Sequence, residues 1–78
     1  MSKLEKKLNE LDYYHFTYTT YHKRFNSSQI FICINDGGNS IRDYYVKSFI
    51  ENEKDLIDSK LAYELMQKDL EVLKQYQD

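Results

Sequence analysis

Residues 13–21 have the sequence YYHFTYTTY, which holds five of the twelve aromatic rings of this 78-residue chain. Aromatic and β-branched residues suit a pleated strand, and strand side chains alternate between two faces. We therefore expect one strand over residues 13–22, with Tyr13, His15 and Tyr21 on the same face. Because only one face of the strand can cover a core, the sequence predicts a second aromatic face at or near the surface.

The next apolar segment continues the sheet over residues 29–35. Its three isoleucines share one face of the predicted strand, and Phe31 and Cys33 share the other. A strand with two apolar faces is typical of a sheet covered on both sides, or of a sheet that gives one face to a partner.

The start of the chain predicts a short amphipathic helix. Ser2 and Glu5 have the spacing of a capping box, in which each side chain accepts a hydrogen bond from the other residue's backbone N–H. Leu4, Leu8 and Leu11 follow at the spacing of one helix face. Because so short a helix is unstable alone in water, we expect it to pack on the sheet.

The segment after the second strand permits two interpretations. Residues 35–39, NDGGN, predict a turn, because Asp-Gly and Gly-Gly tolerate positive φ. Residues 40–46 have the composition of a third strand. Ser40 and Asp43 also match a capping box, and the apolar residues that follow recur at helical spacing, so we favour a helix here.

Residues 55–77 predict the longest helix, for which Asp55 or Asp58 can provide the N-cap. Its apolar arc is about twice as wide as that of an ordinary surface helix. We expect one seam of this arc to contact the sheet and a second to contact another helix, in the same chain or in a second copy. The residues predicted to mediate self-association as a homodimer are Leu56, Tyr63, Met66, Leu70 and Leu73.

These elements predict one small α+β domain over residues 1–78. It has a short N-terminal helix, a two- or three-stranded antiparallel sheet, and one or two C-terminal amphipathic helices packed on the sheet. A chain of this length has a thin core, and its single cysteine excludes an internal disulfide. Stability must then come from well-matched packing or from self-association.

The charge pattern bears on the class of partner. The net charge is −2, with five basic and three acidic residues in positions 1–34, and six basic and ten acidic residues in positions 35–78. Lys23-Arg24 is the longest basic stretch outside the N-terminal helix, whereas a nucleic-acid-binding domain usually carries a basic stripe, so the sequence does not favour nucleic acid. The chain has no apolar run near the ~20 residues of a membrane span and no signal-peptide pattern, and we expect a cytoplasmic protein without membrane contact.

Catalysis and metal binding need a constellation of side chains, and the sequence shows none. His15 and His22 fall on opposite faces of the predicted strand, so a shared metal ion is not expected. Cys33 lies among isoleucines, where cysteine behaves as a small hydrophobe. We therefore expect no enzymatic activity, no metal and no cofactor.

The order of elements resembles that of the double-stranded-RNA-binding domain in layout only. That fold needs basic residues at the start of its last helix, where this chain has acidic ones. The outline also resembles small acidic phage-encoded inhibitors, anti-CRISPR proteins among them, which share a helix, a short sheet with an Asn-Asp-Gly turn and acidic C-terminal helices. From the small size and the composition of the chain, we expect an inhibitor or accessory protein of a phage or mobile element.

We therefore expect a non-enzymatic protein-binding module. Tyrosine is enriched at interface hot spots, although cross-strand aromatic residues also simply stabilise sheets. The candidate partner-binding residues are Tyr13, His15 and Tyr21 of the aromatic face and Glu51, Glu53, Asp55 and Asp58 of the acidic stretch. The alternative is a protein that binds single-stranded nucleic acid through the tyrosine-rich strand and the adjacent Lys23 and Arg24.

Overall fold

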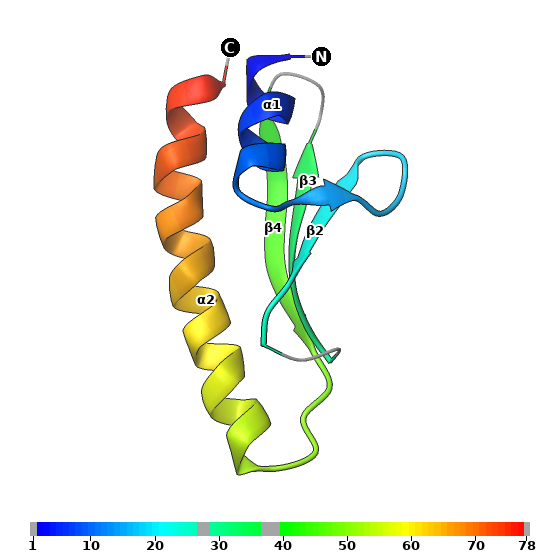
Figure 1. The fold of residues 1–78 in the computed structure, drawn as a ribbon, viewed down its shortest axis with the longest axis vertical. Coiled ribbons are helices and arrows are strands. Elements are labelled where there is room, and N and C mark those ends of the chain that lie inside the picture. Colours follow the sequence, from blue (N-terminus) through cyan, green and yellow to red (C-terminus); the bar gives the residue numbers. More distant parts are fainter. Residues whose placement is uncertain (1, 27–28, 37–39, 78) are drawn as a thin grey trace.

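The computed structural model describes residues 2–26, 29–36 and 40–77, and within them it has an α+β fold. Helix α1 (Lys3–Glu10) precedes an antiparallel sheet, and helix α2 (Glu53–Leu73) follows it (Figure 1). The strands, in the order in which they pair, are β1 (Tyr14–His15), β2 (Thr20–Arg24), β3 (Ile30–Asp36) and β4 (Ile41–Ser48). The predicted α+β class is confirmed, with four strands in the described part of the chain rather than two or three.

Helix α1 begins with the predicted capping box. The Glu5 N–H donates to the Ser2 hydroxyl oxygen (3.1 Å), and the Ser2 N–H donates to the Glu5 carboxylate (3.2 Å). The hydrogen bond from the Ser2 backbone holds the pKa of the Glu5 carboxyl below its usual value. Leu4 and Leu8 are buried against the rest of the chain, as their spacing predicts. The helix ends before Asp12, whose φ of 70° lies in the left-handed region.

The predicted single strand over residues 13–22 is wrong, because this segment forms the hairpin β1–β2. His15 lies opposite Tyr21, and the Phe16 N–H donates to the Thr20 carbonyl (2.8 Å) at the turn. The composition favours extended backbone throughout but does not say where the chain reverses. When the chain reverses, the backbone N–H and C=O groups of β1 and β2 bond to each other. A single extended strand would leave these groups without partners along one of its edges.

The helical interpretation of residues 40–46 is also wrong, because these residues enter strand β4. β4 pairs with β3 along its whole length, beginning with Ile41 opposite Asp36. This pairing satisfies the backbone groups on one edge of β3, which a helix in the same place would leave without partners. Of the turn predicted over residues 35–39, Asn35 and Asp36 belong to β3, and residues 37–39 lie outside the described residues.

Helix α2 confirms the predicted C-terminal helix and continues as a short 3-10 helix (Lys74–Tyr76). Its N-cap is Asn52, whose side chain accepts a hydrogen bond from the Asp55 N–H (2.9 Å), rather than Asp55 or Asp58 as expected. The Asp55 carboxylate instead accepts a hydrogen bond from the Glu51 N–H (3.0 Å). No helix in the described part of the chain is long and apolar enough to cross a membrane.

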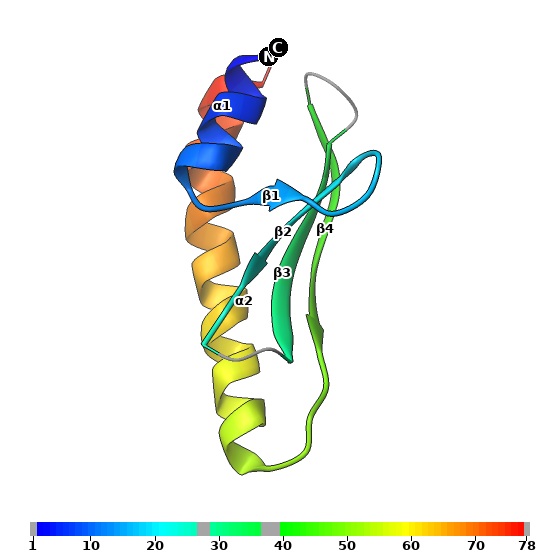
Figure 2. The ribbon, with the colours of Figure 1, turned by 45° about the vertical axis from the view of Figure 1, so that its right-hand side comes forward.

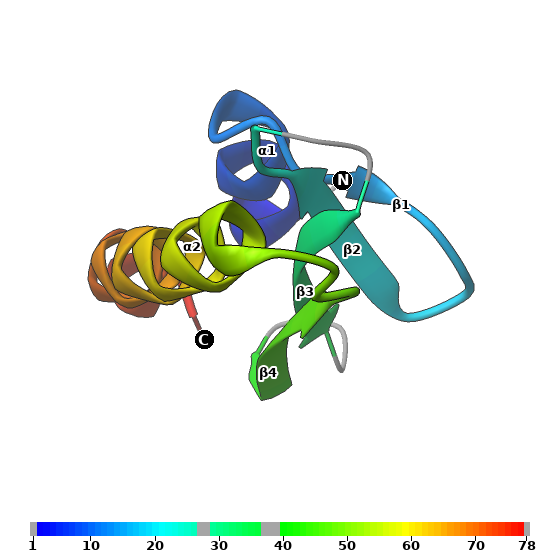
Figure 3. The same ribbon diagram turned by 90° about the horizontal axis from the view of Figure 1, so that it is seen from below.

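The helices α1 and α2 lie on the same side of the sheet (Figures 2 and 3). The apolar core fills the space between this inner face and the two helices. Its buried members are Leu4, Leu8, Tyr13, Tyr21, Ile30, Ile32, Ile34, Ala62, Met66, Leu70 and Leu73. No helix of the described residues lies on the opposite face of the sheet, and we call this face the outer face.

A buried polar cluster joins β2 to α2 beside this core. The Tyr13 hydroxyl donates to the Asp69 carboxylate (2.7 Å), and the Lys23 ammonium pairs with the same oxygen (2.6 Å). Lys23 also donates to the Leu11 carbonyl (3.0 Å) and lies 4.5 Å from the centre of the Tyr13 ring. Burial, together with the bond to Asp69, raises the pKa of Tyr13 far above its usual value. The cluster is thus a fully bonded structural element.

Candidate functional site

The outer face of the sheet carries one row of side chains that spans all four strands. The register places Tyr14 opposite His22, His22 opposite Cys33, and Cys33 opposite Tyr45. Directly opposite residues of antiparallel strands share a face, so these four side chains lie together. Phe31 of β3 lies in the next row of this face, between Arg24 and Lys47.

The rings of this face are stacked on one another. His22 lies between Phe16 and Phe31, with centroid distances of 4.8 Å and 5.3 Å and interplanar angles of 27° and 10°. Phe16 comes from the β1–β2 turn, and folding the hairpin places its ring over His22. These contacts fix the orientation of the imidazole and build a preformed aromatic surface.

A hollow of about 120 Å³ lies in the middle of this surface. The residues that line it are Phe16, His22, Phe31, Cys33, Tyr45, Lys47 and Phe49. Cys33 is nearly buried, and this burial raises the pKa of its thiol, so the group is protonated at neutral pH. The hollow therefore presents aromatic rings and a neutral thiol rather than a nucleophile.

Large apolar side chains remain exposed around the hollow. Phe16 is 62% exposed, Phe49 57% and Tyr45 43%, and the neighbouring Tyr14, which lies opposite His22, is also exposed. The Lys47 ammonium lies 5.9 Å from the centre of the Phe49 ring. Contiguous exposed apolar surface rimmed by polar groups is a common mark of an interaction site.

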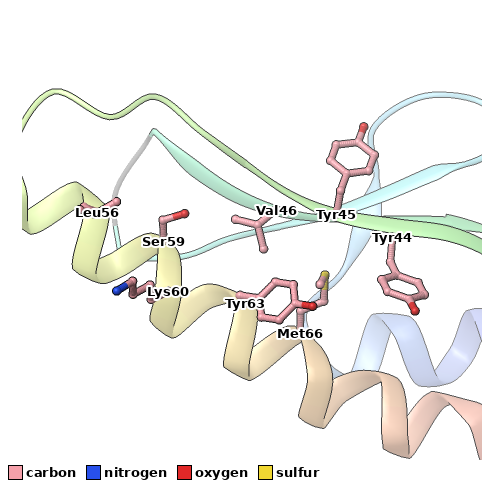
Figure 4. Close-up of a pocket in the computed structure, with 8 residues that line it drawn as sticks. All are labelled: Tyr44, Tyr45, Val46, Leu56, Ser59, Lys60, Tyr63 and Met66. Carbon is pink, nitrogen blue, oxygen red and sulfur yellow. The ribbon is translucent and has the colours of Figure 1, made fainter.

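A second hollow, of about 470 Å³, lies between β4 and α2, on the opposite face of β4 (Figure 4). Tyr44 and Val46 point from β4 toward α2, whereas Tyr45 points away to the outer face (Figure 4). Leu56 and Tyr63 of α2 also line this groove and are 49% and 54% exposed. The groove is thus open and largely apolar.

The aromatic residues predicted to bind a partner do not form one exposed face. Tyr13 and Tyr21 are only 0% and 2% exposed, and of the three only His15 is at the surface. The Tyr21 hydroxyl donates to Glu5 (3.3 Å), and burial with the nearby Glu5 charge raises its pKa to about 12. The expectation failed because the chain turns after β1, and the helices then cover the face that carries Tyr13 and Tyr21.

The four predicted partner-binding residues of the acidic stretch also differ in exposure. Glu51 and Glu53 are exposed, whereas Asp55 and Asp58 are buried. Asp55 has a structural role, because it bonds the backbone at the start of α2.

The residues predicted for self-association also separate into two groups. Met66, Leu70 and Leu73 belong to the core of the chain itself, so the width of the apolar arc reflects contacts with both the sheet and α1. Leu56 and Tyr63 remain exposed along the groove beside β4.

Sequence reasoning missed the residues that make up the outer face, among them His22, Tyr45 and Phe49. The alternation in β3 had indicated a second apolar face through Phe31 and Cys33. The alternation could not predict the strand register, which places side chains of β2 and β4 beside Phe31 and Cys33.

Among the described residues, no group of three or more His, Cys, Asp or Glu side chains is placed to hold a metal ion. Comparison with protein-family models, with curated proteins and with solved structures finds no significant match.

Proposed function

We propose that this protein is a non-enzymatic binding module that docks on a partner protein through the outer face of its sheet. The observation that carries the proposal is the exposed aromatic surface around His22, on a sheet whose inner face is already buried. Aromatic residues, phenylalanine and tyrosine among them, are enriched at protein interfaces, and tyrosine is also enriched at hot spots. The small size and the acidic net charge suit an accessory or inhibitor protein of the phage or mobile-element type.

The size of the hollow supports a protein partner over a small molecule, and the order of the rings favours binding in general. The hollow of about 120 Å³ is well below the roughly 300–1,000 Å³ of typical ligand sites, and its size suits one protruding side chain. The stacked rings on either side of His22 are ordered before any partner arrives, which lowers the entropy cost of binding.

Capture experiments with matched variants test this proposal. The double variant Phe16→Ala/Phe49→Ala should stay folded and lose the partner that the wild-type chain captures from lysate of its native host. Leu61→Ala is the control, because Leu61 is exposed on α2 and lies outside both hollows. Equal capture by the double variant and the control would refute docking through the outer face.

A second candidate function is the binding of single-stranded nucleic acid to the same face. It is favoured by one specific observation, which is that Arg24 and Lys47 lie on either side of Phe31. Bases stack on aromatic rings, and cations beside the rings can meet the phosphates. Fluorescence anisotropy with an unstructured oligonucleotide should then show affinity that falls with salt and is lost in Arg24→Glu/Lys47→Glu.

A further inference from the structure

Strand β4 is the long free edge of the sheet. The other edge, β1, has two residues, whereas β4 has eight. A long edge strand offers unpaired backbone groups to another strand unless charges, prolines or bulges protect it. The bulge opposite Asn35 and Asp36 protects only one end of β4, and the chain contains no proline. The middle of the edge, Tyr44-Tyr45-Val46, carries no formal charge at neutral pH.

The hydrogen bonds of β4 show which backbone groups face the free edge. The Phe49 N–H donates to the Gln29 carbonyl (3.0 Å) on the β3 side. Because successive residues direct their N–H and C=O groups to opposite sides, those of Tyr44 and Val46 point outward. The Tyr44 N–H is occupied by the side chain of the adjacent residue, the Asp43 carboxylate (2.8 Å).

We propose that β4 pairs antiparallel with β4 of a second copy of this chain, with Tyr45 on the two-fold axis. Such a dimer joins the two sheets into one and brings the apolar grooves of the two copies together. The proposal does not depend on the proposed function, because it concerns the edge of the sheet rather than its outer face.

Symmetry limits the registers in which β4 can meet a copy of itself. A two-fold axis normal to the sheet keeps each face continuous, so one residue of β4 must lie opposite the same residue of the second copy. With Tyr45 at this centre, Asp43 lies opposite Lys47 of the second copy, and the reciprocal pair forms as well. Tyr44 then lies opposite Val46 of the second copy on the groove side.

The neighbouring registers lack this match. A centre at Asp43 or at Lys47 places identical charges directly opposite each other, which destabilises strand pairing. A centre at Tyr44 or Val46 forms no ion pair between Asp43 and Lys47. Charge complementarity therefore selects both the occupant, a second copy, and the register centred on Tyr45.

The backbone groups also suit this register. The outward N–H and C=O groups of Tyr44 bond those of Val46 in the second copy, and the symmetric pair does the same. In the dimer, the Asp43 carboxylate no longer accepts a hydrogen bond from the Tyr44 N–H and instead forms an ion pair with the Lys47 ammonium of the second copy. On the groove side, the exposed Leu56 and Tyr63 gain apolar neighbours from the same groove of the second copy.

A charge-swap series tests the pairing. Sedimentation velocity at micromolar concentrations should show a dimer for the wild-type chain. Asp43→Lys and Lys47→Asp each create two like-charged pairs and should raise the dimer dissociation constant by about tenfold or more. The double variant Asp43→Lys/Lys47→Asp should restore it. A wild-type monomer at all concentrations, or a dimer unaffected by the single swaps, would overturn the proposal.

Cross-linking tests the register independently. Opposite residues of a non-hydrogen-bonded pair have Cα atoms about 4.5 Å apart, within disulfide range. Tyr45→Cys in a Cys33→Ser chain should therefore form an intermolecular disulfide on mild oxidation; Cys33 is replaced because it lies opposite Tyr45 within the chain. Phe49→Cys in the same chain is the control and should not cross-link. Equal cross-linking at both positions would contradict the register, and if these variants do not fold, the charge swaps decide alone.

Discussion

The inner and outer faces of the sheet come from the same strands and are both apolar in sequence, yet only one of them is buried. In β3, Ile32 is fully buried by the helices, whereas the adjacent Phe31 is half-buried and contacts His22. Alternation therefore predicts that two apolar faces exist, but the helices decide which one stabilises the chain. The other face keeps large apolar side chains such as Phe16 and Phe49 exposed.

The two faces also differ in the environment of their charged side chains. On the inner side, the charges of Lys23 and Asp69 are paired and bonded to Tyr13. On the outer side, Arg24 and Lys47 keep their charges at the surface beside the rings. We expect substitutions on the inner face to unfold the chain and substitutions on the outer face to leave it folded.

The largest expected effect is that of Ile32→Ala on the inner face. Removing a fully buried isoleucine side chain leaves a cavity and should lower the free energy of unfolding by about 4 kcal/mol. That is a large part of the stability of so small a domain. Urea denaturation followed by circular dichroism measures this loss. If Ile32→Ala is too unstable to measure, Ile32→Val serves in its place and should lower the free energy of unfolding by about 1 kcal/mol. Phe31→Ala is the outer-face control, and an equal loss there would contradict the division between the faces.

The next effect concerns the buried ion pair. Lys23→Met leaves the Asp69 carboxylate without its cation in a buried setting and should cost about 3 kcal/mol in the same assay. Lys7→Met is the matched control, because the ion pair between Lys7 and Glu10 (3.1 Å) is more exposed than that between Lys23 and Asp69. Similar losses in the two variants would show that the Lys23–Asp69 pair is not effectively buried.

A third prediction concerns alkaline pH. The folded pKa of Tyr21 is raised from 10.0 to about 12, so the folded state holds this proton more tightly than the unfolded state. The resulting stability is fully present below pH 10 and is lost as the pH rises from 10 toward 12, by up to about 1.4 kcal/mol per unit. Urea midpoints should fall in this window, and Tyr21→Phe should weaken the dependence. An unchanged dependence in Tyr21→Phe would assign it to other groups, such as Tyr13.

Local signals predicted the parts of the fold that depend on neighbouring residues. The Ser2 and Glu5 capping box, the isoleucine alternation of β3 and the periodicity of α2 each correspond to an observed element. Short-range patterns fix these elements because the groups that bond or pack are a few residues apart in the chain.

The parts that could not be predicted depend on distant contacts. The buried hydroxyl of Tyr13 donates a hydrogen bond to Asp69, which lies 56 residues away in the sequence. The helical periodicity of residues 40–46 was outweighed by the free edge of β3. Predicting the outer face also requires the strand register, because composition alone does not show that Phe16 and Phe31 lie on the two sides of His22.

The smallest expected effect tests whether the outer-face rings are ordered by one another. Phe16→Ala and His22→Ala should each change stability by about 0.5–1 kcal/mol, and their double-mutant cycle should give a coupling of about 0.5 kcal/mol. Tyr18→Ala is the control, because Tyr18 is 97% exposed and no ring contact is found for it among the described residues. It should show no coupling with His22. A Phe16–His22 coupling of zero would mean that the stack is not preformed, and the entropy argument for docking on this face would fail.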